Sequence, residues 1–153
     1  MTRPILTTNN IHPSIQRVVA ETHHDIIVEV QTATTNNDIV VVGMAQNPAP
    51  KRARKALDEI NLDYTYLEYG SYFKLWRRRN ALKMWSGWPT FPMIFVKGVL
   101  IGGSSDLRAL IESGELQSML NWSALIASLA RQPRVILSQL IDSYDSLNFM
   151  NIG

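Results

Sequence analysis

The stretch that decides the fold is SGWPTFPMIFVKGVLIGGSSDLRALIESGEL, residues 86–116. Its beginning cannot form regular structure, because Pro89 and Pro92 stand only three residues apart. Two short apolar runs follow, Met93–Val96 and Val99–Ile101, and a Lys-Gly pair separates them. Strand-forming runs joined by so short a glycine-containing turn predict a β-hairpin.

A helix is expected directly after this hairpin. The pair Gly102-Gly103 ends the second strand, and apolar residues at helical spacing extend over Ser104–Glu112. Ser113-Gly114 closes the segment, as glycine commonly does after a helix. The second half of the domain is therefore predicted to run strand, strand, helix.

The preceding residues alternate between strand and helix. Residues 39–43 form a short apolar run typical of a buried strand, and Asn47 is a good N-cap for a helix over about 48–60, which begins with proline. Residues 64–69 read as a second strand, and a cation-rich helix is expected over about 72–85. Because a strand–helix–strand unit pairs its strands in parallel, the order predicts a mixed four-stranded sheet with helices on both faces.

The two ends of the chain lie outside this pattern. Helical spacing over Pro13–Thr35 predicts a helix, although the β-branched run DIIVEV leaves a strand as the alternative. The C-terminal residues are amphipathic and predict two helices, which either pack back on the domain or form a dimer or partner surface. The expected parts are an N-terminal arm and helix over 1–37, a domain over 38–120 and a helical extension over 121–153.

The amino-acid composition excludes several kinds of reactive site. The chain has 153 residues, 46% of them hydrophobic and 18% charged, which suits one globular domain. It contains no cysteine, so disulfides, thiolate nucleophiles and cysteine metal sites are excluded. The histidines, His12, His23 and His24, have no further ligand at metal-binding spacing, so we expect no metal site.

Charge and hydropathy bear on partners and location. The net charge of +2 is too small to indicate nucleic-acid binding. No apolar run approaches the roughly 18 residues that span a bilayer. We therefore expect a cytoplasmic protein whose partners include neither a nucleic acid nor a membrane.

Residues 86–116 closely resemble the C-terminal half of glutaredoxins, above all the monothiol, iron–sulfur-carrying class. The shared features, in order, are a Trp-Pro-Thr-Phe-Pro segment, a strand ending in Val-Lys-Gly, an Ile-Gly-Gly turn, an Asp-Leu helix and a Ser-Gly-Glu-Leu close. The resemblance covers roughly residues 38–120 and implies a thioredoxin-like α/β fold of glutaredoxin type, with added helices at both ends. It also implies a cis peptide bond between Phe91 and Pro92.

The turn after the first strand departs from that family. Where glutaredoxins carry Cys-Pro-x-Cys or Cys-Gly-Phe-Ser, this chain has Asn47-Pro48-Ala49-Pro50, so Asn47 holds the nucleophile position and Pro50 the resolving position. An amide can neither form a mixed disulfide nor ligate iron, so we expect no thiol–disulfide exchange and no iron–sulfur cluster. For Asn47 the simplest role is that of an N-cap, and contact with a ligand is the alternative.

Other parts of the family's glutathione groove are present in the sequence. By the resemblance, the backbone of Thr90, Phe91 and Pro92 would pair with the cysteinyl part of glutathione. Lys51 follows the degenerate motif, and Arg79 stands at the spacing of a family contact to the glycyl carboxylate. A solvated helix face is the competing reading for the arginine run that contains Arg79.

The turn before the last helix matches the remaining part of that groove. By the resemblance, Gly103, Ser104 and Ser105 would hold the γ-glutamyl carboxylate at the helix N-terminus, which is a favourable place for an anion. The family often has an aspartate at position 105, where it binds the γ-glutamyl amine. Asp106 is the candidate substitute, and loss of that contact is the alternative.

Three functions stay open on these grounds. The first is a redox-inactive glutaredoxin-like binding module for a small anionic thiol such as glutathione, or for a protein partner. The second is a cysteine-independent glutathione-using transferase, in which Asn47 would donate a hydrogen bond to the glutathione sulfur. The third is an assembly subunit with a vestigial groove, which forms a homodimer through its terminal helices.

Overall fold

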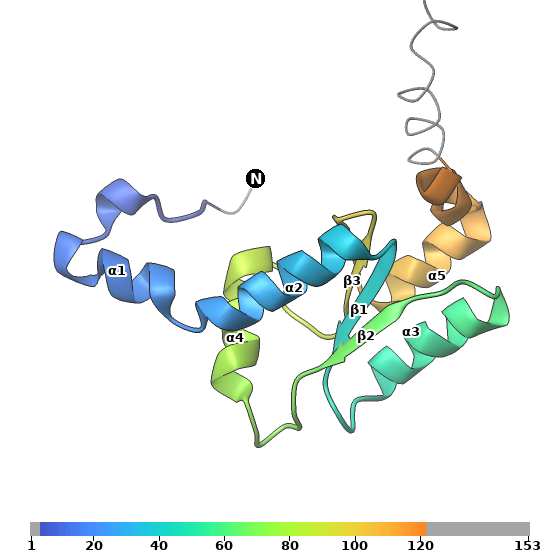
Figure 1. The fold of residues 1–153 in the computed structure, drawn as a ribbon, viewed down its shortest axis with the longest axis horizontal. Helices are drawn as coiled ribbons and strands as arrows, with labels where there is room; N and C mark the ends of the chain where they lie inside the picture. Colours follow the sequence, from blue (N-terminus) through green and yellow to red (C-terminus); the bar gives the residue numbers. More distant parts are fainter. Residues whose placement is uncertain (1–3, 122–153) are drawn as a thin grey trace, which may run out of the picture.

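The structure, a computed structural model, describes residues 4–121 (Figure 1). The elements follow in the order η1 (Thr8–Asn10), α1 (Pro13–Glu21), α2 (His24–Asn36), β1 (Ile39–Gly43), α3 (Pro48–Glu59), β2 (Thr65–Glu68), α4 (Trp76–Ser86), β3 (Met93–Val96), β4 (Val99–Gly102) and α5 (Ser104–Ser113). From β1 onward this is the strand and helix order that the sequence predicts.

The four strands form one mixed sheet in the order β2-β1-β3-β4. β1 runs parallel to β2 and antiparallel to β3, with Val42 opposite both Leu67 and Met93. β3 and β4 form the predicted hairpin, and both residues of its turn have positive φ, 51° at Lys97 and 78° at Gly98. A two-residue turn of this kind matches the twist of the strands that it joins.

Helices cover both faces of the sheet, as predicted (Figure 1). Side chains alternate along a strand, so Val40 and Val42 of β1 face one layer while Ile39 and Val41 face the other. The first core contains α2 and α4 through Ile26, Val30, Ala81 and Leu82. The second contains α3 and α5 through Ala53, Leu57 and Leu107, together with Leu116 beyond α5. The glutaredoxin-type thioredoxin-like architecture is thus confirmed.

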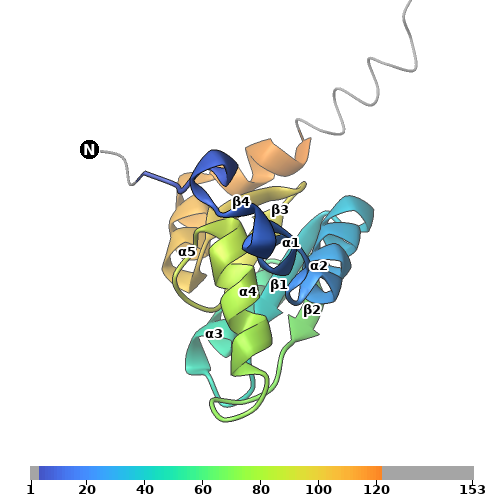
Figure 2. The same ribbon diagram turned by 90° about the vertical axis from the view of Figure 1, so that its left-hand side faces the viewer.

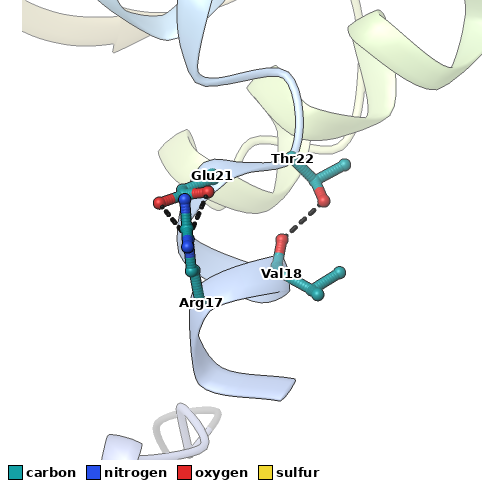
Figure 3. A network of polar contacts seen from close by, with 4 residues as sticks. All are labelled: Arg17, Val18, Glu21 and Thr22. Atoms are coloured by element: carbon teal, nitrogen blue, oxygen red, sulfur yellow. Dashed lines mark hydrogen bonds and ion pairs between the residues drawn. The ribbon is translucent and has the colours of Figure 1, made fainter. Parts of the chain in front are cut away.

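The helix predicted over residues 13–35 is two helices. α1 ends where the Thr22 hydroxyl donates to the carbonyl of Val18 at 2.5 Å, beside an exposed ion pair between Arg17 and Glu21 (Figure 3). His23 follows in the left-handed region with φ of 53°, and α2 begins after it. The run DIIVEV lies in α2 and is helical, so the strand alternative is wrong.

The helix expected from about residue 72 begins later, at Trp76. Leu75 has a positive φ of 60°, which cannot continue a right-handed helix. Arg79 adds a second reason, because its guanidinium binds the carbonyls of Tyr72 and Lys74 and keeps them out of a helical ladder. Residues 70–75 therefore form a loop between β2 and α4.

The described range ends shortly after α5. The two helices expected in the C-terminal extension lie outside the described residues, apart from its first residue. Among residues 4–121, no helix has both the length and the apolar character needed to cross a membrane.

Candidate functional site

The N-terminus of α3 is built on Asn47. Its side-chain oxygen accepts a hydrogen bond from the amide of Ala49 at 2.9 Å, which makes it the N-cap that the sequence predicts. Pro48 stands at the first helical position, and Pro50 is buried beneath the turn. Gly43 permits this close approach of strand and helix, because a Cβ there would lie 2.9 Å from the Cβ of Pro50.

The same side chain reaches a loop that is far away in sequence. The Asn47 side-chain nitrogen donates to the carbonyl oxygen of Phe91 at 3.3 Å, across 44 residues. The peptide bond between Phe91 and Pro92 is cis, and both side chains are buried, whereas Thr90 before them is exposed. Asn47 therefore joins the α3 N-terminus to the loop of residues 87–92, which we call the proline loop, through its side-chain oxygen and one of its two side-chain N–H groups.

The turn before α5 lies against the other side of the proline loop. A side chain at Gly103 would begin 3.6 Å from the Pro92 carbonyl oxygen and 3.7 Å from the Trp88 ring. The Gly103 amide donates to the Asp106 carboxylate at 2.8 Å, so Asp106 caps the first turn of its own helix. Its carboxylate also offsets part of the positive potential of that helix terminus.

A small hollow of about 200 Å³ opens between α3 and α5. It is lined by Arg52 from α3 and by Ser104, Ser105 and Arg108 from α5. Within residues 4–121 neither guanidinium forms an ion pair with a carboxylate. Two cations, two hydroxyl groups and a helix N-terminus together suit a carboxylate or another small anion. Sequence reasoning missed Arg108, although its position four residues after Ser104 places both on one face of the helix.

A second hollow of about 300 Å³ lies on the β2 side of the same α3 terminus. It is lined by Met44, Gln46, Asn47, Pro48, Lys51, Arg54, Tyr66 and Glu68. The Arg54 guanidinium lies 4.1 Å from the centre of the Tyr66 ring, and the Tyr66 hydroxyl donates to Glu68 at 3.0 Å. Lys51 therefore shares a hollow with Asn47 that has a mixed charge, unlike the hollow at Arg52.

Tyr66 gives this hollow a predictable response to alkaline pH. Burial raises the pKa of its hydroxyl to about 12, and the hydrogen bond to Glu68 and the charge of Glu68 add to the effect. The unfolded chain releases this proton near pH 10. Because the folded pKa is the higher one, this contribution to stability is complete below pH 10 and is lost as pH rises towards 12.

We therefore expect Tyr66→Phe to flatten the fall in the free energy of unfolding between pH 10 and 12, as measured by urea unfolding. Tyr72→Phe, which removes an exposed hydroxyl group, is the matched control. An equal slope in the Tyr66→Phe variant and the natural protein would contradict the assignment.

The Arg79 side chain is buried and binds backbone carbonyls of the preceding loop. The residue is only 6% exposed, and burial lowers the pKa of its guanidinium. Its nitrogens donate to the carbonyls of Tyr69 at 2.9 Å, Lys74 at 2.5 Å and Tyr72 at 3.4 Å. The structure thus places Arg79 as the internal support of the loop before α4, and a ligand role for it stays a prediction.

Lys83, one helical turn after Arg79, lies closer to the proline loop. Its ammonium nitrogen is 5.6 Å from the centre of the Phe91 ring.

The structure therefore brings together Asn47, the proline loop and the turn at Gly103, with cations on several sides. This arrangement offers hydrogen bonds and positive charge to an anion but no nucleophilic thiol. Within the described residues, no group of three His, Asp or Glu side chains is placed to hold a metal ion.

Comparison with known proteins gives consistent matches. The glutaredoxin family profile matches residues 39–101. A glutaredoxin-like protein of Dictyostelium discoideum is 44% identical over 114 residues, which are 74% of this chain and 91% of that protein. A probable monothiol glutaredoxin of Legionella pneumophila is 36% identical over 69 residues, or 45% of this chain and 74% of that protein. The crystal structure of a buckwheat glutaredoxin–glutathione complex aligns with a TM-score of 0.59 and 25% identity, over 66% of this chain and 92% of the other.

Proposed function

Because this chain belongs to the glutaredoxin family yet contains no cysteine, we propose that it is a redox-inactive binding module that holds glutathione, or a similar γ-glutamyl anion, without covalent chemistry. Thiol–disulfide exchange needs a thiolate to attack and a thiol to be released, and the protein supplies neither. Ligation of an iron–sulfur cluster by a protein thiolate is excluded for the same reason. What remains of the family's chemistry is recognition.

The observation that carries this proposal is the cationic hollow at the start of α5. Arg52 and Arg108 face it with Ser104 and Ser105, and no carboxylate of residues 4–121 pairs with either arginine. Two unpaired guanidinium groups repel each other and gain most from an anion between them. We assign this hollow to the γ-glutamyl carboxylate, with the first amides of α5 as additional donors.

The rest of the ligand follows from the neighbouring loops. The backbone of Thr90, an exposed residue, and the carbonyl of Phe91 are assigned to the cysteinyl part, since a carbonyl oxygen can accept a second hydrogen bond beside that from Asn47. Lys51 and Lys83 are the assigned cations for the glycyl carboxylate. Asn47 then stands where the family's thiol would face the sulfur of glutathione.

The transferase alternative depends on the second side-chain N–H group of Asn47. A donor that activates the glutathione sulfur must have a free N–H or O–H group. The Asn47 oxygen accepts from Ala49, and one of the two side-chain N–H groups donates to Phe91, so one N–H group has no partner among the described residues. Because the two existing bonds hold the carboxamide to the backbone, we assign Asn47 first a structural and steric role, and turnover of a reactive electrophile with glutathione would support the transferase instead.

Calorimetric titration with reduced glutathione tests the proposal. We expect saturable binding, and we expect Arg52→Gln and Arg108→Gln each to raise the Kd about three- to tenfold, since a charged hydrogen bond at a partly exposed site contributes roughly 1 kcal/mol. Lys55→Gln is the control, because Lys55 lies on the same helix but pairs with Glu59. No binding at millimolar glutathione, or an equal effect of the Lys55 variant, would overturn the assignment.

A further inference from the structure

The loop between β2 and α4 exposes large apolar side chains that do not contribute to the core. Phe73 is 93% exposed, Tyr72 57%, Trp76 53% and Leu75 44%. We call residues 72–77, which carry these side chains and extend into the first turn of α4, the aromatic loop. Folded monomers seldom leave large apolar side chains gathered in water without a binding role.

The backbone of this loop is held in place by hydrogen bonds, although its side chains are exposed. The buried Arg79 guanidinium binds the carbonyls of Tyr69, Tyr72 and Lys74 and so draws the polar backbone inward. The amide of Lys74 also donates to Ser71 at 3.2 Å within the loop. A buried charged group, the Arg79 guanidinium, thus holds the backbone of a loop whose apolar side chains are exposed.

The charged residues of the loop segment itself are all basic, although Asp25 of the neighbouring α2 pairs with Arg78. Lys74 and Arg77 interleave with its apolar residues, and the Arg77 guanidinium lies 5.4 Å from the centre of the Trp76 ring. The sequence has no aspartate or glutamate anywhere in residues 69–105. The preceding acid, Glu68, accepts a hydrogen bond from Tyr66. The loop therefore complements a surface that is both apolar and negatively charged.

We propose that the aromatic loop binds the surface of an anionic lipid bilayer, with Phe73 inserted among the acyl chains and Lys74 and Arg77 at the headgroups. Tyrosine and tryptophan rings prefer the membrane–water boundary, because one end of each ring is apolar and the other polar. Basic residues beside them gain from anionic lipids. Protein–protein interfaces are also enriched in aromatic residues and arginine, but they are depleted in lysine, and Lys74 stands between Phe73 and Leu75.

The position of the loop allows such a contact. Figures 1 and 2 show the loop before α4 and the loop before α3 at the same end of the molecule, and the Ala45 amide donates to Gly70 at 2.8 Å between them. A peripheral contact needs no spanning helix, so this proposal revises the sequence-based expectation that a membrane is not a partner. It does not depend on glutathione binding.

Co-sedimentation of the full chain with vesicles tests the proposal. The vesicles are phosphatidylcholine alone, and phosphatidylcholine with about one third phosphatidylserine. We expect binding to the anionic vesicles only, with a blue shift of tryptophan fluorescence that Trp76→Phe removes. Phe73→Ser should weaken binding about tenfold, since it removes the most exposed apolar side chain of the loop.

Matched variants separate specific insertion from general attraction. Met84→Ser changes a residue that is 76% exposed on α4 outside the loop and should leave binding unchanged. Lys74→Glu should weaken binding several-fold more than Lys55→Glu, which alters net charge equally on α3. Circular dichroism checks that each variant is folded. No binding to anionic vesicles, as expected for a loop that serves a protein partner, overturns the proposal, and so does equal loss in the Lys74 and Lys55 variants.

Discussion

Asn47→Cys is expected to form a mixed disulfide with glutathione when the protein is treated with oxidised glutathione. The introduced thiolate would attack one sulfur of the disulfide, form a new sulfur–sulfur bond and release reduced glutathione. The N-terminus of α3 should lower the pKa of this thiol below its usual value of about 8.5. The chain has no other cysteine, so mass spectrometry would report the modification at this position alone.

His12→Cys is the matched control for this experiment. His12, like Asn47, is the N-cap of a helix that begins with proline, and its side chain accepts from the amide of Ser14 at 3.3 Å. It has no proline loop or cationic hollow assigned to it. Faster formation of the mixed disulfide at position 47 than at position 12 would therefore show that the groove binds glutathione near the thiol. Equal rates in two folded variants would show that the groove contributes nothing.

Arg79→Leu is expected to cause the largest loss of stability among the substitutions that we propose. It removes the donor to the three carbonyls of Tyr69, Tyr72 and Lys74, in a place that water reaches poorly. The desolvation cost of the buried guanidinium is recovered, which offsets part of the loss. The net decrease in the free energy of unfolding should be about 2–4 kcal/mol by urea denaturation.

Arg77→Leu provides the comparison, because Arg77 belongs to the same arginine run but is exposed on α4. Its effect should stay within about 0.5 kcal/mol. Hydrogen exchange should also show faster exchange at Lys74, whose amide bond to Ser71 lies in the supported loop, in the Arg79 variant only. Similar stability of the two variants would mean that Arg79 does not hold the loop.

The fold could be predicted because its signals are local. The β3–β4 hairpin follows from two apolar runs and a Lys-Gly turn, and the N-cap at Asn47 follows from one residue before a proline. The start of α4 could not be predicted in the same way, since Arg79 acts from inside the helix on carbonyls that precede it. The break between α1 and α2 could not be predicted either. The residue with the positive φ at this break is His23, and no glycine or proline marks the position in the sequence.

The candidate site was predictable in its parts but not in its connections. The resemblance pointed to the proline loop and to the turn at Gly103, and the structure places these next to each other. The hydrogen bond between Asn47 and Phe91 and the shared hollow of Arg52 and Arg108 join segments that no sequence pattern relates. Those connections depend on the tertiary packing of α3 and α5 on the sheet.

The measurement that tests the central claim most directly is a titration of the isotope-labelled natural protein with reduced glutathione, followed by amide chemical shifts. The account predicts fast, saturable shifts at Ser104 and Ser105 and at Phe91, with no covalent adduct in the recovered protein. The amide of Gly98, in the β3–β4 turn, should not move. Absence of shifts at millimolar glutathione, or shifts confined to other parts of the chain, would contradict a retained groove that binds without chemistry.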